Sequence, residues 1–322
     1  MTPADFAFFQ TFLKQRSGLA LAADKEYLLE SRLKPILRRN SIEDIGEVAR
    51  ELRAGRNRAL ENAVVEAMTT NESFFFRDKT PFDQFRDQVM PDIIKTRGVN
   101  KRLRVWCAAA STGQEPYSIS MILKEMAPQL PNWRTEIIGT DLSNEVLEKA
   151  RAGLYSQFEV QRGLPVQMLL KYFEQQGEMW QLNPAIRAMV QYRTLNLLEN
   201  FSNLGQFDVV FCRNVLIYFD AQTKLDVLNR ISRVLAPDGY LVLGAAETVV
   251  GLTTDFVPQQ GGRGIYRPNG HGKAAERPAM RLAANGGAFG GIGSGAAAPA
   301  ASPVSATRAG SNVLPITGVR PR

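Results

Sequence analysis

The stretch VWCAAASTGQEPYS, residues 105–118, decides the fold of this chain. It predicts a buried strand, a loop of very small residues and then a helix, which is the usual arrangement for binding a phosphate or a nucleoside. A dinucleotide-binding loop would need three glycines, whereas this loop has only Gly113. A Walker-type lysine loop is also absent from the sequence. The stretch therefore favours a ligand that has a ribose but no phosphates.

On both sides of this stretch, strand-like and helical patterns alternate. The strand-like runs are 103–108, 136–140, 207–213 and 240–245, and the helical stretches between them are 115–126, 144–153 and 221–235. Such alternation predicts a mostly parallel sheet covered by helices. Residues 157–195 interrupt the pattern with a helical piece at 166–173 and strand candidates at 179–182 and 189–193. This segment predicts a small antiparallel insertion.

The two ends of the chain differ from the middle. Residues 1–70 predict a bundle of four short amphipathic helices, in which Pro35 is expected to kink the second helix. Ser41 and Asp44 resemble a capping box that opens the third. The Gly/Ala/Pro-rich segment 269–322 cannot bury enough apolar surface to offset the entropy of ordering, so we expect it to be disordered.

Composition excludes several kinds of function. The net charge of +7 comes mostly from the tail, which carries six Lys and Arg against Glu276, so the remainder is only about +2 and does not resemble a nucleic-acid surface. His271, the one histidine, lies in that tail, which argues against Ser-His triads and histidine-based metal sites. Cys107 and Cys212 are too few for a disulfide framework. With no signal peptide or membrane-spanning run, the sequence predicts a cytoplasmic protein.

Two acidic residues flank the expected ligand site. Glu115 lies in the first turn of the helix after the small-residue loop, where an acid also stabilises the helix dipole. Asp141 ends the next strand, where it can accept hydrogen bonds from ribose hydroxyls or simply cap the following helix. Together they favour a phosphate-free nucleoside cofactor. S-adenosylmethionine (SAM) fits best, because its ammonium and sulfonium charges suit a site that contains two carboxylates.

A third cluster, FDVVFCRNVLIYF, spans residues 207–219. Arg213 and Asn214 follow the apolar strand at the ligand-binding edge of a parallel sheet, and Tyr218 follows within a turn. Arg213 could instead pair with a local carboxylate and Tyr218 could be core packing. Two polar residues at the end of an apolar strand, on this edge of the sheet, favour a functional role over a structural one.

With these motifs in order, the chain resembles the chemotaxis receptor methyltransferases (CheR family). The resemblance covers roughly residues 5–268, and the matching segments are TTNESFFFRD (69–78), RVWCAAASTGQEPYSIS (104–120), GTDLSNEVLEKARAGLY (139–155), NLL (196–198), FDVVFCRNVLIYFD (207–220) and LAPDGYLVLGAAET (235–248). It implies a Rossmann-like class I SAM-dependent methyltransferase sheet with an N-terminal all-α domain and a small antiparallel β insertion. The implied domains are a receptor-docking domain at 1–78 and a methyltransferase domain at 79–268, with the insertion at 157–195.

The resemblance implies a protein-glutamate O-methyltransferase that esterifies glutamates on the cytoplasmic helices of chemoreceptors. We expect this enzyme to need no metal, to bind no nucleic acid, not to insert into the membrane, and to be a monomer. The implied SAM contacts are Asn71, Ser73, Arg77, Glu115, Asp141, Asn196, Leu197, Arg213 and Asn214. In the family, the residues that match Arg213 and Tyr218 lie close to the transferred methyl. The family often has Thr at position 73 and usually His-Ser at 245–246, so nothing is carried over to Ala245 or Ala246.

The resemblance also implies that a basic helix docks on the acidic receptor. Arg32, Lys34, Arg38 and Arg39 form an acid-free run at helical spacing, whereas a second run at 50–58 fits a solvated face better. Some members grip a receptor C-terminal peptide through a glycine-containing loop of the insertion. Because 174–180 offers only Gly177, a tether-independent enzyme is favoured.

Two alternatives remain at this stage. A SAM core is shared by many methyltransferases, so the acceptor could be a small molecule or RNA. The chain could also be a regulator that binds SAM or receptors without catalysis, although such a module would not need Arg213 and Tyr218.

Overall fold

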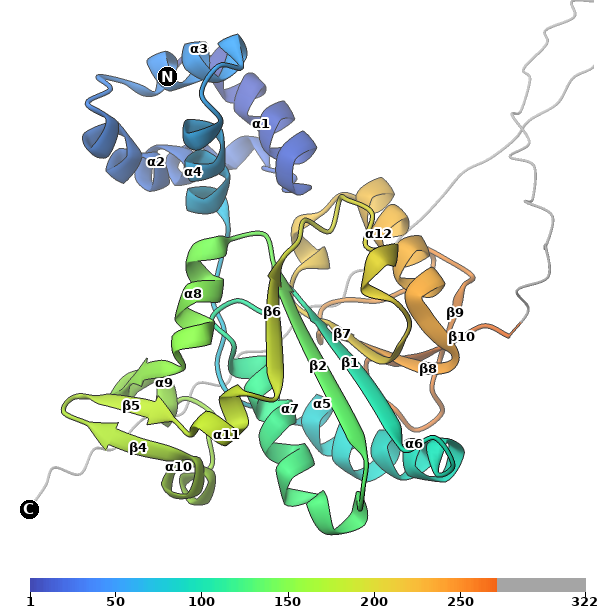
Figure 1. The fold of residues 1–322 in the computed structure, drawn as a ribbon. Helices are drawn as coiled ribbons and strands as arrows, with labels where there is room; N and C mark the ends of the chain where they lie inside the picture. Colours follow the sequence, from blue (N-terminus) through green and yellow to red (C-terminus); the bar gives the residue numbers. More distant parts are fainter. Residues whose placement is uncertain (271–322) are drawn as a thin grey trace, which may run out of the picture. The chain divides into compact units, whose positions relative to one another are not determined.

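The computed structural model describes residues 1–270, so the expected disordered tail, 269–322, lies outside the described residues except for its first two. The chain begins with four helices that share one hydrophobic core: α1 (Pro3–Ser17), α2 (Glu26–Asn40), α3 (Ile45–Ala54) and α4 (Arg58–Met68). They group together in Figure 1. The predicted four-helix bundle is confirmed. None of the helices in residues 1–270 combines the length and hydropathy needed to cross a bilayer.

The start of α3 differs from the prediction. Asp44, and not Ser41, is the N-cap, and its carboxylate accepts a hydrogen bond from the backbone N–H of Glu47 at 2.9 Å. Ser41 instead ends α2 in the left-handed region at φ 54°. The predicted capping box was therefore wrong, because an Asp just before the first helical residue reaches the free N–H groups directly. Pro35 lies inside α2, which continues to Asn40.

A seven-stranded sheet forms the centre of the rest of the described chain. Its order is β6-β2-β1-β7-β8-β10-β9, and the first five strands are parallel. β10 pairs antiparallel with β8, and β9 pairs antiparallel with β10. The strands are β1 (Arg102–Ala108), β2 (Arg134–Asp141), β6 (Val190–Thr194), β7 (Phe207–Cys212), β8 (Leu235–Leu243), β9 (Phe256–Pro258) and β10 (Ile265–Pro268). The predicted parallel α/β sheet is confirmed.

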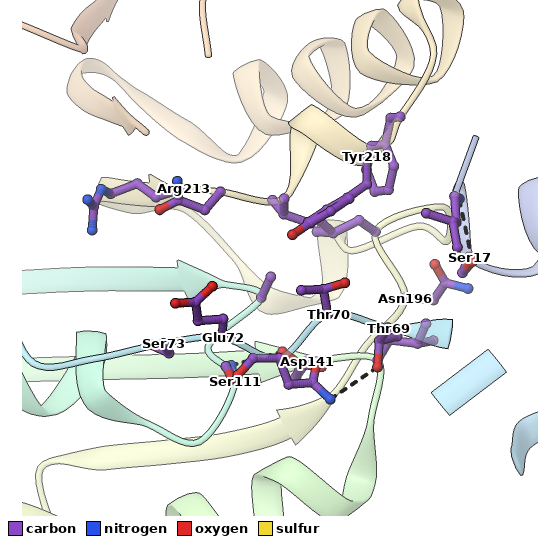
Figure 2. Close-up of a pocket in the computed structure, with 18 of the residues that line it drawn as sticks. Ser17, Thr69, Thr70, Glu72, Ser73, Ser111, Asp141, Asn196, Arg213 and Tyr218 are labelled. Carbon is purple, nitrogen blue, oxygen red and sulfur yellow. Dashed lines mark hydrogen bonds between the residues drawn. The ribbon is translucent and has the colours of Figure 1, made fainter. Parts of the chain in front are cut away.

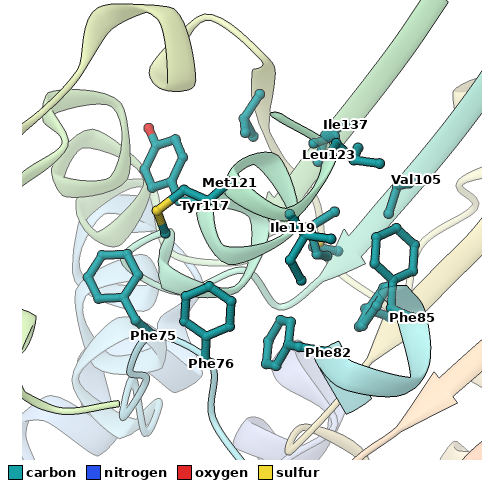
Figure 3. Close-up of a cluster of buried hydrophobic side chains, with 14 of the residues drawn as sticks. Phe75, Phe76, Phe82, Phe85, Val105, Tyr117, Ile119, Met121, Leu123 and Ile137 are labelled. Atoms are coloured by element: carbon teal, nitrogen blue, oxygen red, sulfur yellow. The ribbon is translucent and has the colours of Figure 1, made fainter. Parts of the chain in front are cut away.

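Both faces of the sheet are buried because successive side chains of a strand point to opposite sides. Val105 and Cys107 of β1 belong to the core that also holds side chains of α7, and Trp106 and Ala108 belong to the opposite core. Figure 3 shows the first core, where aromatic side chains such as Phe82 pack beside α7. A strand that is apolar on both faces is typical of a central parallel strand.

The covering helices divide between these two cores. On the first face lie α5 (Thr80–Gln84), a π-helical turn at Phe85–Val89, α6 (Met90–Arg97) and α7 (Gln114–Glu125). On the second face lies α12 (Ala221–Val234). The helix α8 (Asn144–Ala152) follows β2.

The insertion is smaller than predicted. Its antiparallel sheet has the order β3-β5-β4, with β3 (Leu154–Ser156), β4 (Phe173–Gln176) and β5 (Met179–Leu182). In the sequence, the short helices α9 (Gln157–Gln161) and α10 (Val166–Tyr172) lie between β3 and β4, and α11 (Pro184–Arg187) follows β5. The candidate strand at 189–193 was assigned wrongly, because β6 pairs in parallel with β2 in the main sheet. A short apolar run does not reveal which strand it pairs with, so only the tertiary structure shows which sheet β6 joins.

The chain order creates a switch point between β1 and β7. From β1 the chain adds β2 and β6 on one side, and it then returns to add β7 and β8 on the other. In open parallel sheets, ligands bind outside the carboxyl ends of the strands at such a point.

Candidate active site

A cavity opens at the carboxyl ends of β1 and β7 (Figure 2). The space inside it, part of which is open solvent, is about 1030 Å³. Every residue predicted to contact SAM or to lie near the methyl lines this cavity: Asn71, Ser73, Arg77, Glu115, Asp141, Asn196, Leu197, Arg213, Asn214 and Tyr218. Figure 2 shows Arg213 and Tyr218 along one side, with Ser111 and Asp141 along the other.

The loop after β1 is a tight turn that a close neighbour constrains. Ala109, Ser111 and Gly113 all have positive φ, at 59°, 50° and 93°. A Cβ atom on Gly113 would lie 2.6 Å from the hydroxyl of Tyr192. The single glycine is therefore required by the packing against β6 and by the backbone conformation, and a phosphate contact is not needed to explain it.

Asp141 holds this loop from the end of β2. Its carboxylate accepts hydrogen bonds from the backbone N–H of Ser111 at 2.9 Å and of Ser143 at 3.0 Å. Burial raises the pKa of Asp141, and the backbone N–H groups partly oppose the rise. The helix cap is Ser143, whose hydroxyl accepts from Val146, so Asp141 does not cap α8 itself. The carboxylate joins two neighbouring loops at the wall of the cavity.

Arg213 forms a buried ion-pair cluster. The exposed fraction of its side chain is 1%, and its guanidinium donates to Glu115 at 2.9 Å and to Asp78 at 2.7 Å. It also donates to the carbonyl of Arg77 at 2.9 Å. Burial raises the pKa of Glu115, and the charge of Arg213 acts in the opposite direction. The alternative that Arg213 pairs with a local carboxylate thus describes its contacts, and one of the two carboxylates, that of Glu115, lines the cavity.

The linker between α4 and α5 forms another wall. Ser111 donates its hydroxyl hydrogen to the carbonyl of Asn71 at 2.9 Å, and the Asn71 amide donates to Thr69 at 3.1 Å. Arg77 donates to the carbonyl of Glu72 at 2.8 Å. The first of these bonds joins the linker to the loop after β1, and the other two lie within the linker.

The helical N-terminal region also contributes to the cavity, which the sequence did not reveal. Ser17, the last residue of α1, and Leu19, two residues further on, are among its lining residues. The Asn196 amide donates to the carbonyl of Arg16 at 2.7 Å and so connects the end of α1 to the segment after β6. A serine and a leucine at the end of a helix carry no ligand signature, so only the tertiary contacts reveal this role.

The predicted docking residues divide into two kinds. Arg32 donates to the carbonyls of Met68 and Thr69 at 2.7 and 3.0 Å, so it stabilises the C-terminal end of α4. Lys34, Arg38 and Arg39 are exposed. Arg32 and Arg39 line a second cavity, between α2 and α8, while Lys34 and Arg38 lie outside it.

The second cavity shares a wall with the first. Asn71, Glu72 and Ser73 line both cavities. Elsewhere in its lining, Glu66 of α4 accepts hydrogen bonds from the Ser143 hydroxyl at 3.0 Å and the Asn144 N–H at 3.1 Å. The α4 helix is therefore bonded to the start of α8, beside the Asp141 loop.

Comparison with known proteins identifies two family profiles. The profile described as "CheR methyltransferase, all-alpha domain" matches residues 4–69, and "CheR methyltransferase, SAM binding domain" matches residues 71–265. In residues 1–270, no three His, Cys, Asp or Glu side chains cluster in a way that could hold a metal.

Two bacterial relatives match this chain over almost their full lengths. The chain is 44% identical to chemotaxis protein methyltransferase 1 of Pseudomonas aeruginosa, over 82% of this chain and 97% of that protein. It is 42% identical to chemotaxis protein methyltransferase Cher2 of Pseudomonas putida, over 81% and 96%. A solved glycopeptide N-methyltransferase, MtfA complexed with sinefungin, matches at 14% identity with a TM-score of 0.29, over 49% of this chain and 48% of that chain, too low to add to the fold described above.

Proposed function

The chain belongs to the CheR methyltransferase family and carries out SAM-dependent methylation in chemotaxis, and we propose that it esterifies glutamate side chains on the cytoplasmic helices of chemoreceptors. The observation that carries this proposal is the buried Glu115–Arg213 pair in a cavity that Asp141 and Tyr218 also line. We further propose that residues 1–78 dock the receptor and residues 79–268 transfer the methyl, in a cytoplasmic monomer.

The cavity suits SAM in charge and in shape. Glu115 and Asp141 place two carboxylates beside a loop of small residues, which complements a ligand that carries an ammonium and a sulfonium. When bound, SAM supplies a methyl group on a sulfonium, which is a strong leaving group. Asn71, Ser73, Arg77, Asn196, Leu197 and Asn214 are the remaining residues that we propose to hold it.

The acceptor chemistry needs little from the protein beyond orientation. A glutamate carboxylate is already ionised at neutral pH, since its ordinary pKa is about 4.3, so no general base is required. The remaining step is an in-line displacement, in which proximity and alignment account for most of the acceleration. The cavity lining, as described for residues 1–270, includes no histidine, and the reaction does not require one.

Arg213 and Tyr218 are the residues that we propose to act nearest the reacting atoms. Because the Arg213 guanidinium is already bonded to Glu115 and Asp78, an acceptor carboxylate would have to exchange with one of them. Asp78 is the more exposed of the two, at 39% against 12%, so it is the partner that can leave. Tyr218 borders the cavity and can donate a hydrogen bond to the same carboxylate.

Labelled SAM and a panel of receptor cytoplasmic domains test the proposal. A glutamate methyl ester releases volatile methanol in base, whereas an N-methyl product does not, so base-labile label is the expected result. Stable label on a receptor would indicate another acceptor atom. Tight SAM binding without label on any receptor would favour a non-catalytic regulator.

A further inference from the structure

Glu247 lies in the turn after β8, and its carboxylate accepts hydrogen bonds from five backbone N–H groups. One oxygen accepts from Gly244 and Asn214, both at 2.8 Å. The other accepts from Val215 at 2.9 Å, Leu216 at 2.8 Å and Ile217 at 3.3 Å. The residue is 8% exposed. A buried carboxylate with this many donors is fixed in place by them.

Four of these donors belong to the segment that carries the proposed active-site residues. Arg213, Asn214 and Tyr218 line the cavity, and a 3₁₀ turn spans Leu216–Tyr218. The first N–H groups of such a turn have no partner within it, so an external acceptor is needed where they are buried. Glu247 supplies that acceptor from the turn after β8.

The segment is also strained at its first bend. Asn214 has φ 58°, in the left-handed region that non-glycine residues seldom adopt. Such a conformation persists only where surrounding contacts enforce it. The hydrogen bond from the Asn214 N–H to Glu247 is one of those contacts.

Gly244 makes room for the carboxylate. A Cβ atom at Gly244 would lie 2.7 Å from a carboxylate oxygen of Glu247 and 3.0 Å from the backbone nitrogen of Asn214. The end of β8, the carboxylate and the segment after β7 therefore pack at closer range than any side chain at position 244 would allow.

We propose that Glu247 is a positioning residue for methyl transfer, holding residues 213–218 so that Arg213, Asn214 and Tyr218 face the bound methyl donor and the acceptor. Among the described residues, Glu247 itself is outside the set that lines the cavity, so it acts through the segment it anchors. The inference rests on the proposed function only for its assay of receptor methylation.

The chemistry requires a carboxylate of this length. Glutamine would turn one oxygen into an NH₂ group, which would face either two or three N–H donors and accept from none of them. Aspartate has one methylene fewer, so it cannot reach all five donors from the same backbone position. Both substitutions loosen the segment without touching the cavity directly.

The test compares Glu247→Gln with Asp208→Asn in the full chain. Asp208 is a matched control, because it lies on β7 and its carboxylate accepts from the Arg104 N–H at 2.8 Å and from Arg97 at 3.1 Å, at the strand end away from the cavity. For Glu247→Gln, we expect kcat to fall by about 100-fold, as a misplacement of about 1 Å can cause. The SAM dissociation constant, measured by calorimetry, should rise about tenfold.

Asp208→Asn should lower the melting temperature while kcat and the SAM dissociation constant stay near the wild-type values. If Glu247→Gln behaves in the same way, Glu247 only stabilises the fold and the inference is wrong. If Glu247→Gln does not fold, Glu247→Asp and Gly244→Ala ask the same question, because each displaces the carboxylate. Wild-type protein that methylates no receptor would contradict the proposed function, and the SAM dissociation constants would still decide the role of Glu247.

Discussion

Replacing Arg213 by alanine tests the charge balance of the cavity. Removing one partner of a buried ion pair leaves the other charge without compensation, which costs about 3–5 kcal/mol. Glu115 is that partner, since its side chain is 12% exposed. Asp78, at 39%, is open enough to solvent to add little. Because the pair borders a cavity, we expect a loss of about 3 kcal/mol in the free energy of unfolding.

The loss should depend on pH in a direction that the structure determines. Burial raises the pKa of Glu115 and Arg213 opposes it, so the alanine variant should have a still higher pKa at Glu115. A carboxyl with a higher pKa in the folded state binds more protons there, so stability falls as pH rises from the unfolded value of about 4.3 through the folded pKa. The deficit relative to wild type should be larger at about pH 8 than at about pH 5.

Urea unfolding of four proteins measures this: wild type, Arg213→Ala, Glu115→Gln and the double variant. Glutamine at position 115 removes the buried charge, so the double variant should be more stable than Arg213→Ala at about pH 8 and should lose the pH dependence. A deficit that is equal at both pH values, with no recovery in the double variant, would refute the reasoning.

Three further substitutions test other parts of the molecule. Arg38→Glu with Arg39→Glu should raise KM for the receptor and flatten its dependence on salt, with the SAM dissociation constant unchanged as the control; an unaltered KM would return both to an ordinary solvated face. Gly113→Ala, at φ 93° and 2.6 Å from the Tyr192 hydroxyl, should destabilise by about 1–3 kcal/mol in thermal unfolding, and a wild-type melting curve would contradict the steric argument. Asp141→Asn should weaken SAM binding about tenfold in calorimetry, because the amide removes a charge and opposes one backbone N–H; binding equal to that of wild type would exclude Asp141 from the site.

Much of the fold could be predicted because it rests on local patterns. The limits of β5 agree with the run 179–182, and α1 to α4 are the four short helices expected within residues 1–70. β6 was misassigned because its five residues read the same in either sheet, and only pairing with β2 distinguishes the two. The start of α3 was misread because Ser41 and Asp44 both have side chains that can cap a helix.

The cavity residues were predictable as a group because each stands just after a strand, or in a motif that the family resemblance carries. Their partners were not, since Arg213 and Glu115 lie 98 positions apart in the sequence and Arg213 and Asp78 lie 135 apart. No local pattern links such residues. Their role in binding and catalysis stays a prediction.

The sequence alone determined the order of the elements, the small-residue loop and the acids beside it, because periodicity and residue size act over a few neighbouring positions. Only the tertiary structure decided that the Tyr192 hydroxyl leaves no room for a side chain at Gly113 and that the end of α1 helps to line the cavity. It also decided that the Glu247 carboxylate accepts hydrogen bonds from the N–H groups of the segment after β7. These depend on backbone groups that every residue carries and on distances across strands, so they become visible only once the sheet has brought its strand ends together.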